Sequence, residues 1–423
     1  MFKKGGVILK IFFAALLNAL SVLPMAIAIS HITELAGGDF TSTFAGIFLS
    51  ASVGTVLFAR RTNMPFIFFP NLALIVSFYY VEIISRGTPL ETVLGAAFIA
   101  AFTGGWLVFF KWDKKIVDFF PERLVSAFFF GISLFLIAEG LKLAEILLPS
   151  PFNFAMTGDL YSPLAFASIV GILVFLLIFF KNHSLSVLGA VLFTLAVSYL
   201  NGYIAFDEIV APPALPGKGF FTLDIWAGLC RLDLVFELLF IMWVVSHMMV
   251  DTLSRLPDNV EKMPKVGVPL FASNVLASLL GVFMLMCSPF STVGIASGGQ
   301  NARVSYATAG FFVMMIFFEP AAKSLVDFPV CFAVAMVGAG IFMISHAKNN
   351  EDFLQGDFAE ILSAILIIFL IPATGNILGV IGFSLILYIM LKCLSGKFKD
   401  ISLGAWVIGV LFIVNYMIKE CFF

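Results

Sequence analysis

The stretch CSPFSTVGIASGGQNARVS, Cys287 to Ser305, interrupts a chain that is otherwise almost continuously hydrophobic. It contains a proline, three glycines, a run of hydroxyl and amide side chains, and an arginine near its end. Inside a membrane, irregular backbone is tolerated only where it is buried in protein or lines a cavity. The stretch therefore predicts a broken membrane span whose polar start faces the protein interior.

The composition indicates that the whole chain is a membrane protein. Hydrophobic residues make up 61% of the 423 residues and charged residues only 12%, whereas a soluble domain has about 25% charged residues. A spanning helix needs about 20 residues, so the chain has room for on the order of 14 spans, and we expect an all-α polytopic membrane protein. The basic and then apolar N-terminus lacks a clear signal-peptide cleavage site and is interpreted as the first span. Candidate spans lie at 7–30, 43–59, 65–80, 90–111, 122–145, 163–180, 184–201, 230–254, 266–286, 290–303, 304–320, 324–346, 358–372 and 377–395, with a further apolar segment at 401–419.

A second span also looks broken. The stretch NMPFIFFPN, Asn63 to Asn71, contains two prolines and, like the first stretch, a Pro-Phe step. If the chain consists of two halves of about seven spans, the two stretches occupy corresponding positions. Interrupted segments at matching positions in two halves indicate a transporter binding site. The alternative is that these prolines and glycines only kink ordinary membrane helices.

The distribution of Lys and Arg predicts the orientation. Pairs such as Lys3-Lys4 and Arg60-Arg61 lie at loops on the side of the N-terminus, whereas loops 31–42 and 146–162 contain neither residue type. Cytoplasmic loops carry the excess of basic residues. We therefore expect a cytoplasmic N-terminus and a multi-pass protein of the cell membrane, the inner membrane of a bacterium.

Several function classes find no support in the sequence. It contains no Walker A sequence, no cluster of His and Cys with metal-ligand spacing, and no nucleophile–base pair outside the membrane. The five cysteines are scattered and are interpreted as small apolar residues. No basic patch is large enough for nucleic acid. We expect no enzyme activity, no metal and no cofactor.

The order and spacing of several stretches resemble the nucleobase–cation symporter 2 superfamily, and most closely its adenine/guanine/hypoxanthine permease branch. SPFSTVG and GIASGGQNAR are similar to the start and end of the family's tenth span, and NMPFIFFPNLAL is similar to its third span. DKKIVDFFPERLVSAFFFGISLFLIAEGLKLA resembles the loop and fifth span, VDTLSRL a Phe-Asp-Thr step in the eighth, and GDFAEILSAILIIFLIPATGNILGVIGFSLILY the thirteenth and fourteenth.

The resemblance implies an architecture and a function. It implies 14 segments in two inverted repeats of seven, at 1–205 and 228–400, followed by an extra hydrophobic segment at 401–423. Segments 1–4 and 8–11 form a core domain, segments 5–7 and 12–14 form a gate domain, and segments 3 and 10 are half-helices. The implied activity is proton-coupled uptake of a nucleobase, with the lipid bilayer as surroundings, and a homodimer is compatible with it.

The candidate site residues come from segments 3, 8 and 10. The family's tenth span has a glutamate just after the Ser/Thr pair, whereas this chain has Val293, Gly294 and Ile295 there. The eighth span offers Ser246, and it places His247 and Asp251 four residues apart, on one helix face. A histidine near its ordinary pKa is suited to carry a coupled proton. The candidates for substrate binding are Ser291, Thr292, Phe290, Asn71, Phe69, Ser246 and His247, and those for proton coupling are His247 and Asp251.

Each candidate also has a structural interpretation. Ser291 and Thr292 are suited to donate to a carbonyl oxygen or ring nitrogen of a base, but hydroxyls at a helix start also cap it. Phe69 and Phe290 are suited to stack on a base, but 51 phenylalanines make packing the commoner role. Asp251 lies close to the cytoplasmic end of its span, where water solvates carboxylates.

Two other functions remain open. One is anion transport by a protein of the related sulfate-permease type, since a half-helix N-terminus is suited to bind anions. The other is a membrane protein that no longer transports and serves as a scaffold.

Overall fold

Two three-residue strands lie at the centre of the computed structural model, between the two broken spans. Strand β1 (Phe68–Pro70) pairs antiparallel with β4 (Leu285–Cys287), with Phe69 opposite Met286. Helix α3 (Leu72–Phe78) starts just after β1, and α12 (Ser291–Ala296) starts just after β4. The prediction of half-helices in segments 3 and 10 is confirmed. The structure describes residues 2–110, 121–150, 155–181, 185–206, 208–212, 219–254, 266–296, 299, 301–326, 328–347 and 356–422.

The all-α prediction holds for the fold class but missed these strands and the exact extent of the broken spans. The backbone groups next to each proline need partners inside the membrane, and each broken span supplies them to the other. Segment 10 was predicted to run to 303, but α12 ends at Ala296 and Arg303 lies in the next helix. The side chain of Asn301 accepts a hydrogen bond from the Arg303 N–H at 3.1 Å, which caps that helix at its start.

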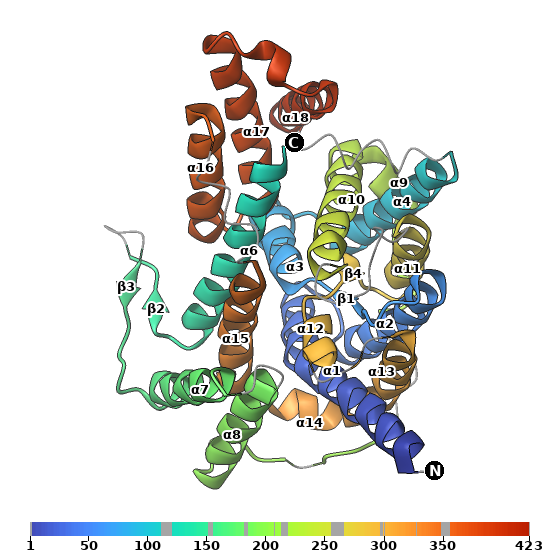
Figure 1. The fold of residues 1–423 in the computed structure, drawn as a ribbon, viewed down its shortest axis with the longest axis vertical. Coiled ribbons are helices and arrows are strands. Elements are labelled where there is room, and N and C mark those ends of the chain that lie inside the picture. The colour runs from blue at the N-terminus through green and yellow to red at the C-terminus, as the bar shows by residue number, and fades with distance from the viewer. Residues whose placement is uncertain are drawn as a thin grey trace.

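The helices form two bodies, which we call the core and the gate (Figure 1). The core surrounds the strand pair and contains both half-helices. Its α3 continues into a π-helix, η1 (Tyr79–Ser85). The remaining core helices are α1 (Phe2–Leu35), α2 (Phe40–Thr62), α4 (Leu90–Phe109), α9 (Ile225–Cys230), α10 (Leu232–Ser254), α11 (Gly267–Leu279) and α13 (Ala302–Met315), with η4 (Ile316–Phe318) and α14 (Glu319–Ser324) after it.

The gate lies beside the core and packs against it through α15 and α6, which approach α1 and α3. A short hairpin, β2 (Leu147–Leu148) with β3 (Met156–Thr157), follows its first helix. The gate helices are α6 (Glu122–Leu143), α7 (Pro163–Phe179), α8 (Ser186–Leu200), α15 (Val330–Ala347), α16 (Phe358–Thr374) and α17 (Ile377–Leu394).

An ion-pair network joins three gate helices at one end. Lys392 near the end of α17 lies 2.8 Å from both Asp357 and Glu360 at the start of α16. Arg123 at the start of α6 pairs with Glu360, and Lys397 pairs with Asp357 at 3.3 Å. Charges arranged in such a network stabilise more than an isolated surface pair does, so the network supports the gate as one unit.

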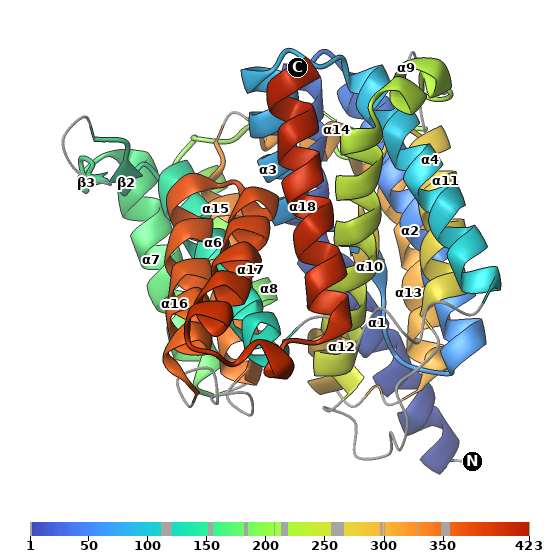
Figure 2. The same cartoon turned by 90° about the horizontal axis from the view of Figure 1, so that it is seen from above.

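The C-terminal segment forms a further helix, α18 (Leu403–Phe422), after a 3-10 turn, η6 (Phe398–Asp400). Figure 2 shows α18 running alongside α10 of the core, next to α17 of the gate, and both neighbours contact it. Within the described residues, six helices are long and apolar enough to cross a membrane, and seven shorter helices are also apolar. A multi-pass membrane protein follows from these helices, whereas the count of fourteen segments and the repeat boundaries stay predictions.

Two polar side chains from neighbouring helices hold the outer edges of the strand pair. The Phe68 N–H donates to Thr55 Oγ1 of α2 at 3.0 Å. On the other side, the Leu285 N–H donates to Asn274 Oδ1 of α11 at 2.8 Å, and Asn274 Nδ2 donates to the Leu285 carbonyl at 2.6 Å. Thr55 and Asn274 are both fully buried. The outward N–H of Phe68 and both backbone groups of Leu285 are therefore satisfied without water.

Replacing Asn274 tests this role. Asn274→Leu leaves the N–H and C=O of Leu285 without partners, and each buried unmatched group costs about 1–3 kcal/mol. We expect a clearly lower midpoint of thermal unfolding in detergent. Ser273→Ala is the matched control, because Ser273 bonds only within its own helix, to the Pro269 carbonyl. Equal midpoints for the two variants would show that Asn274 does not stabilise the strand pair.

Candidate functional site

A cavity lies where the two broken spans face the gate. The core side is formed by Phe69 and Asn71 of segment 3 and by Ser288 and Phe290 of segment 10. The gate side comes from α6 and α15, with Met25 of α1 between the two bodies. The cavity volume is about 30 Å³, close to the share of liquid volume of one water molecule. A base does not fit this space unless the core and the gate move apart.

The walls of this cavity are mostly apolar. Asn71 and Ser288 are the two polar residues among the described residues that line it. Apolar walls with a few placed polar groups are typical of small-molecule sites. The arrangement suits a flat ligand whose two faces pack against apolar side chains and whose edge forms a small number of hydrogen bonds.

Ser291 has its hydroxyl engaged by the protein. It is fully buried, it accepts from the Ile67 N–H at 3.0 Å, and it donates to the Ser288 carbonyl at 2.6 Å. The Ser288 N–H in turn donates to the Ile67 carbonyl at 2.9 Å. Ser291 therefore joins the two broken spans beyond the end of the strand pair. Thr292 is in α12, and its side chain is outside the described part of the chain.

The remaining candidates in segments 3 and 10 line the cavity. Asn71 caps α3, with its Oδ1 accepting from the Leu74 N–H at 3.3 Å. Phe290 is buried at the start of the second half-helix. The ring of Phe69 packs against those of Phe48 and Phe312, with centroids 6.0 and 5.8 Å away, so it serves the core as well as the cavity wall.

The candidates in α10 lie away from the cavity lining. His247 is buried, its Nδ1 lies 2.7 Å from the Trp243 carbonyl, and its ring stacks on that indole with centroids 5.8 Å apart. A carbonyl only accepts, so Nδ1 carries the hydrogen in this contact. Ser246 Oγ is buried and has no hydrogen-bond partner within the described residues. Asp251 lies in the last turn of α10, and its side chain is not among those described.

Sequence analysis missed Asn18, a fully buried amide in α1. Its Oδ1 accepts from the Gly294 N–H at 2.8 Å, and its Nδ2 has no partner in the described part of the chain. A Cβ on Gly294 would lie 2.4 Å from Nδ2, so a glycine is needed for this close approach. The available signal was a single amide in the apolar run FFAALLNALSV. Asn18 thus ties α1 to the second half-helix.

No metal site emerges from the residues that the structure describes, since no three His, Cys, Asp or Glu side chains lie together in a suitable group.

Comparison with known proteins adds relatives that match nearly the whole chain, although no family model matches it. A putative permease of Methanocaldococcus jannaschii is 27% identical over 98% of this chain and 97% of its own length. A guanine/hypoxanthine permease of Bacillus subtilis is 25% identical, covering 90% and 91% of the two chains. An adenine permease of Escherichia coli is 24% identical, covering 91% and 87%. These relatives confirm the resemblance to the purine branch of the nucleobase–cation symporter 2 superfamily.

Solved structures confirm the fold. The transmembrane domain of a cyanobacterial bicarbonate transporter superposes with a TM-score of 0.61 at 19% identity, over 88% of this chain and 97% of that one. Murine solute carrier 26 family member A9, an anion transporter, superposes in its inward-facing state with a TM-score of 0.60 at 12% identity, over 92% and 69%. At these identities the likeness concerns the architecture of core and gate alone.

The unfolding midpoint and the affinity for substrate together distinguish the role of Ser291 from that of Thr292. Ser291→Ala leaves the buried Ile67 N–H unmatched, so we expect a loss of about 1–3 kcal/mol in stability and a lower unfolding midpoint. Thr292→Val should leave the midpoint near that of the parent and weaken substrate binding, by about 1–3 kcal/mol if its hydroxyl donates to the ligand. Ser21→Ala is the control, since that hydroxyl bonds only to the Leu17 carbonyl of its own helix. An unchanged midpoint for Ser291→Ala with weaker binding would assign its hydroxyl to the substrate instead.

Proposed function

We propose that the protein is a secondary active permease that takes up a nucleobase together with protons across the cell membrane. The observation that carries this proposal is the full-length similarity to proteins named as guanine/hypoxanthine and adenine permeases. A purine such as adenine, guanine, hypoxanthine or xanthine is the proposed substrate, with uracil as a further candidate. The proposed setting is a bacterial inner membrane with the N-terminus in the cytoplasm.

The cavity supports this substrate class by its chemistry. Phe69 and Phe290 offer aromatic faces to a planar ring, and Asn71 offers an amide that both donates and accepts. The N–H groups of Phe290, Ser291 and Gly294 at the start of α12 have partners in Ser288 and Asn18. We propose Thr292 as a hydroxyl donor beside them, and Ser291 as the residue that keeps the two half-helices in register.

Transport requires the site to open to one side at a time. With a cavity of about 30 Å³, the structure corresponds to a closed arrangement of core and gate. We propose that the core moves as a unit against the gate, because the strand pair and Asn274 hold the half-helices within the core. The substrate then travels with Phe69, Asn71 and Phe290, while the α6 and α15 walls stay behind.

We assign proton coupling to α10. His247, whose Nδ1 lies 2.7 Å from the Trp243 carbonyl, is the residue we propose to bind and release the coupled proton. Asp251 lies one helical turn further along the same face and is the second candidate for proton coupling. Ser246 is proposed to contact the substrate from the same helix when the cavity widens.

Anion transport is the second candidate. It is favoured by the architecture shared with a bicarbonate transporter, and a half-helix start is suited to bind an anion. Among the described residues that line the cavity, however, Asn71 and Ser288 are the polar ones, and neither supplies a fixed positive charge. The nucleobase assignment therefore has more support.

Uptake by purified protein in liposomes decides between these functions. We expect accumulation of labelled hypoxanthine, adenine or guanine when the outside is more acidic than the inside, and no accumulation in protein-free liposomes. Saturable uptake of bicarbonate or sulfate without any base would identify an anion transporter. Failure to move either class, with folded protein confirmed by its unfolding transition, would leave the scaffold interpretation.

His247→Gln tests the coupling assignment. Glutamine keeps a polar side chain but does not titrate, so we expect uptake driven by a pH gradient to fall strongly. Exchange of labelled for unlabelled base at equal pH should persist, because it requires no net proton movement. A variant that still accumulates base along a pH gradient as the parent does would place the coupled proton elsewhere.

A further inference from the structure

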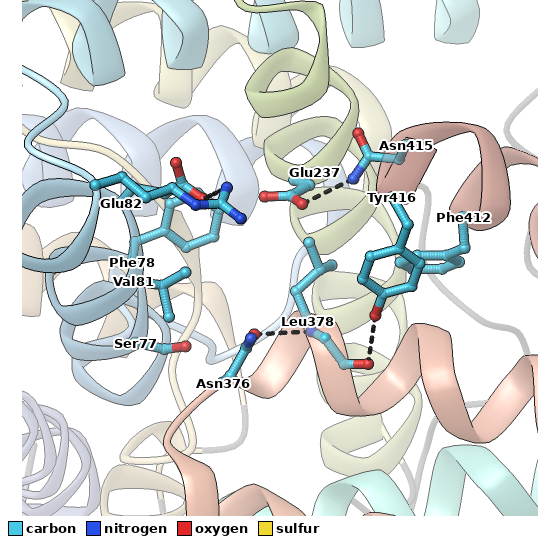
Figure 3. A pocket seen from close by; sticks show the side chains of 12 residues that line it. Ser77, Phe78, Val81, Glu82, Glu237, Asn376, Leu378, Phe412, Asn415 and Tyr416 are labelled. Atoms are coloured by element: carbon cyan, nitrogen blue, oxygen red, sulfur yellow. Dashed lines mark hydrogen bonds and ion pairs between the residues drawn. The ribbon is translucent and has the colours of Figure 1, made fainter. Parts of the chain in front are cut away.

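A second cavity, of about 50 Å³, lies between the core and the gate on the proposed outer side (Figure 3). It shares no lining residue with the cavity at the half-helices. Its described walls come from five elements, α3, η1, α10, α17 and α18, and they carry polar side chains that include Glu82, Glu237, Asn376, Asn415 and Tyr416. A polar space of this size has room for a water molecule.

Glu237 of α10 is the central acid of this cavity. Its side chain is only 5% exposed, and its Oε1 accepts a hydrogen bond from Asn415 Nδ2 at 2.8 Å. Asn415 is 4% exposed and is the amide in an otherwise largely apolar helix. An ionisable residue inside a membrane is costly to bury and is by default associated with function.

Helix α18 contacts both bodies at this cavity. Phe412 packs on the ring of Phe240 in the core, with centroids 5.0 Å apart, and also lies against Gly382 of the gate, where a Cβ would be 2.5 Å from its ring. The Tyr416 hydroxyl donates to the Gly379 carbonyl of α17 at 2.8 Å. Because Asn415 is bound to the core and Tyr416 to the gate, movement between the bodies must break one of these contacts.

Charged groups from several elements lie around Glu237, and most of them are paired with one another. Arg231 is held by Asp233, at 2.9 and 2.8 Å, and by Glu82 at 3.1 Å. Arg86 at the end of η1 pairs with Glu82 at 2.8 Å. Glu82 and Arg86 face the cavity from η1 and its end, Tyr416 faces it from α18, and α17 contributes the neutral Asn376. Asp233 and Glu82 thus have arginine partners, and Glu237 accepts from the amide of Asn415, on the helix that contacts both bodies.

We propose that Glu237 takes up the coupled proton from the outer side, and that Asn415 is the positioning residue that binds its ionised form. The Glu237 carboxylate accepts strongly from Asn415, which keeps α18 bound across core and gate. A proton from the outer solution converts it to a neutral acid, the bond weakens, and the core becomes free to move. The proton leaves again on the inner side, through His247. This inference rests on the proposed function.

Two variants test the proposal in liposomes. Glu237→Gln keeps the size and the acceptor for Asn415 but does not titrate, so we expect a loss of at least tenfold in base accumulation along a pH gradient. Exchange at equal pH should persist. Asn415→Leu removes the donor that stabilises the ionised form, so the pH of half-maximal uptake should rise by about one unit. Glu91→Gln, an exposed acid at the start of α4, is the control and should keep the parental profile.

A measurement that needs no substrate separates this proposal from the proposed function. Hydrogen–deuterium exchange over residues 403–422 should speed up on acidification in the parent and become independent of pH in Glu237→Gln, after correction for the intrinsic exchange rate. Parental pH dependence in Glu237→Gln, in exchange over α18 or in uptake, overturns the role of Glu237. Loss of equal-pH base exchange in Glu237→Gln also overturns it, because the residue would then serve movement itself. If exchange over α18 depends on pH in the parent but the protein moves no base, the proposed function is refuted and the role of Glu237 stands.

Discussion

The need to pair backbone groups in the middle of a membrane governs this structure. Each of the two broken spans interrupts its helix beside a proline, and each therefore exposes N–H and C=O groups where no water is available. The pairing of β1 with β4 satisfies those groups by joining the two halves of the chain. Thr55 and Asn274 satisfy the outer edges. The positions of both half-helices, and of the cavity between them and the gate, follow from this one contact.

The sequence predicted the parts of the site that depend on local chemistry. The two stretches with Pro-Phe steps, at Pro65 and Pro289, together with the resemblance, predicted two half-helices where the structure has them. Proline alone does not decide this, because Pro24 lies inside α1 and Pro372 inside α16. Asn71 was predicted as a substrate-binding candidate. The structure places it as the N-cap of α3 and in the cavity wall.

The parts that depend on distant residues were not predictable from one sequence. Ser291 had two interpretations from the sequence, a donor to a ligand and a helix cap, and neither predicts the bond that its hydroxyl makes to Ile67, 224 residues away. Asn18 in α1 bonds to Gly294, which is 276 residues away in the sequence. The residues next to Asn18 in the sequence do not predict that contact. Ser246 and His247 were predicted as substrate-binding candidates from the eighth span, and the structure places them in α10, outside the described lining of the cavity. Polarity identifies residues that need a partner, whereas only the fold decides which partner they have.

Helix α18 lies at the boundary between the two bodies. A core that slides against a gate needs an interface without strong bonds between the two bodies, and the walls of the cavity at the half-helices meet this need, since they are mostly apolar. Helix α18 adds polar bonds at another point of the same boundary, to Glu237 on one side and to Gly379 on the other. A bond between neutral groups there would simply slow the movement, because it would have the same strength at every pH. A bond to a carboxylate differs, since a single proton changes its strength. The placement of an acid, rather than another amide, opposite Asn415 is therefore what allows the proton supply to decide when the two bodies separate.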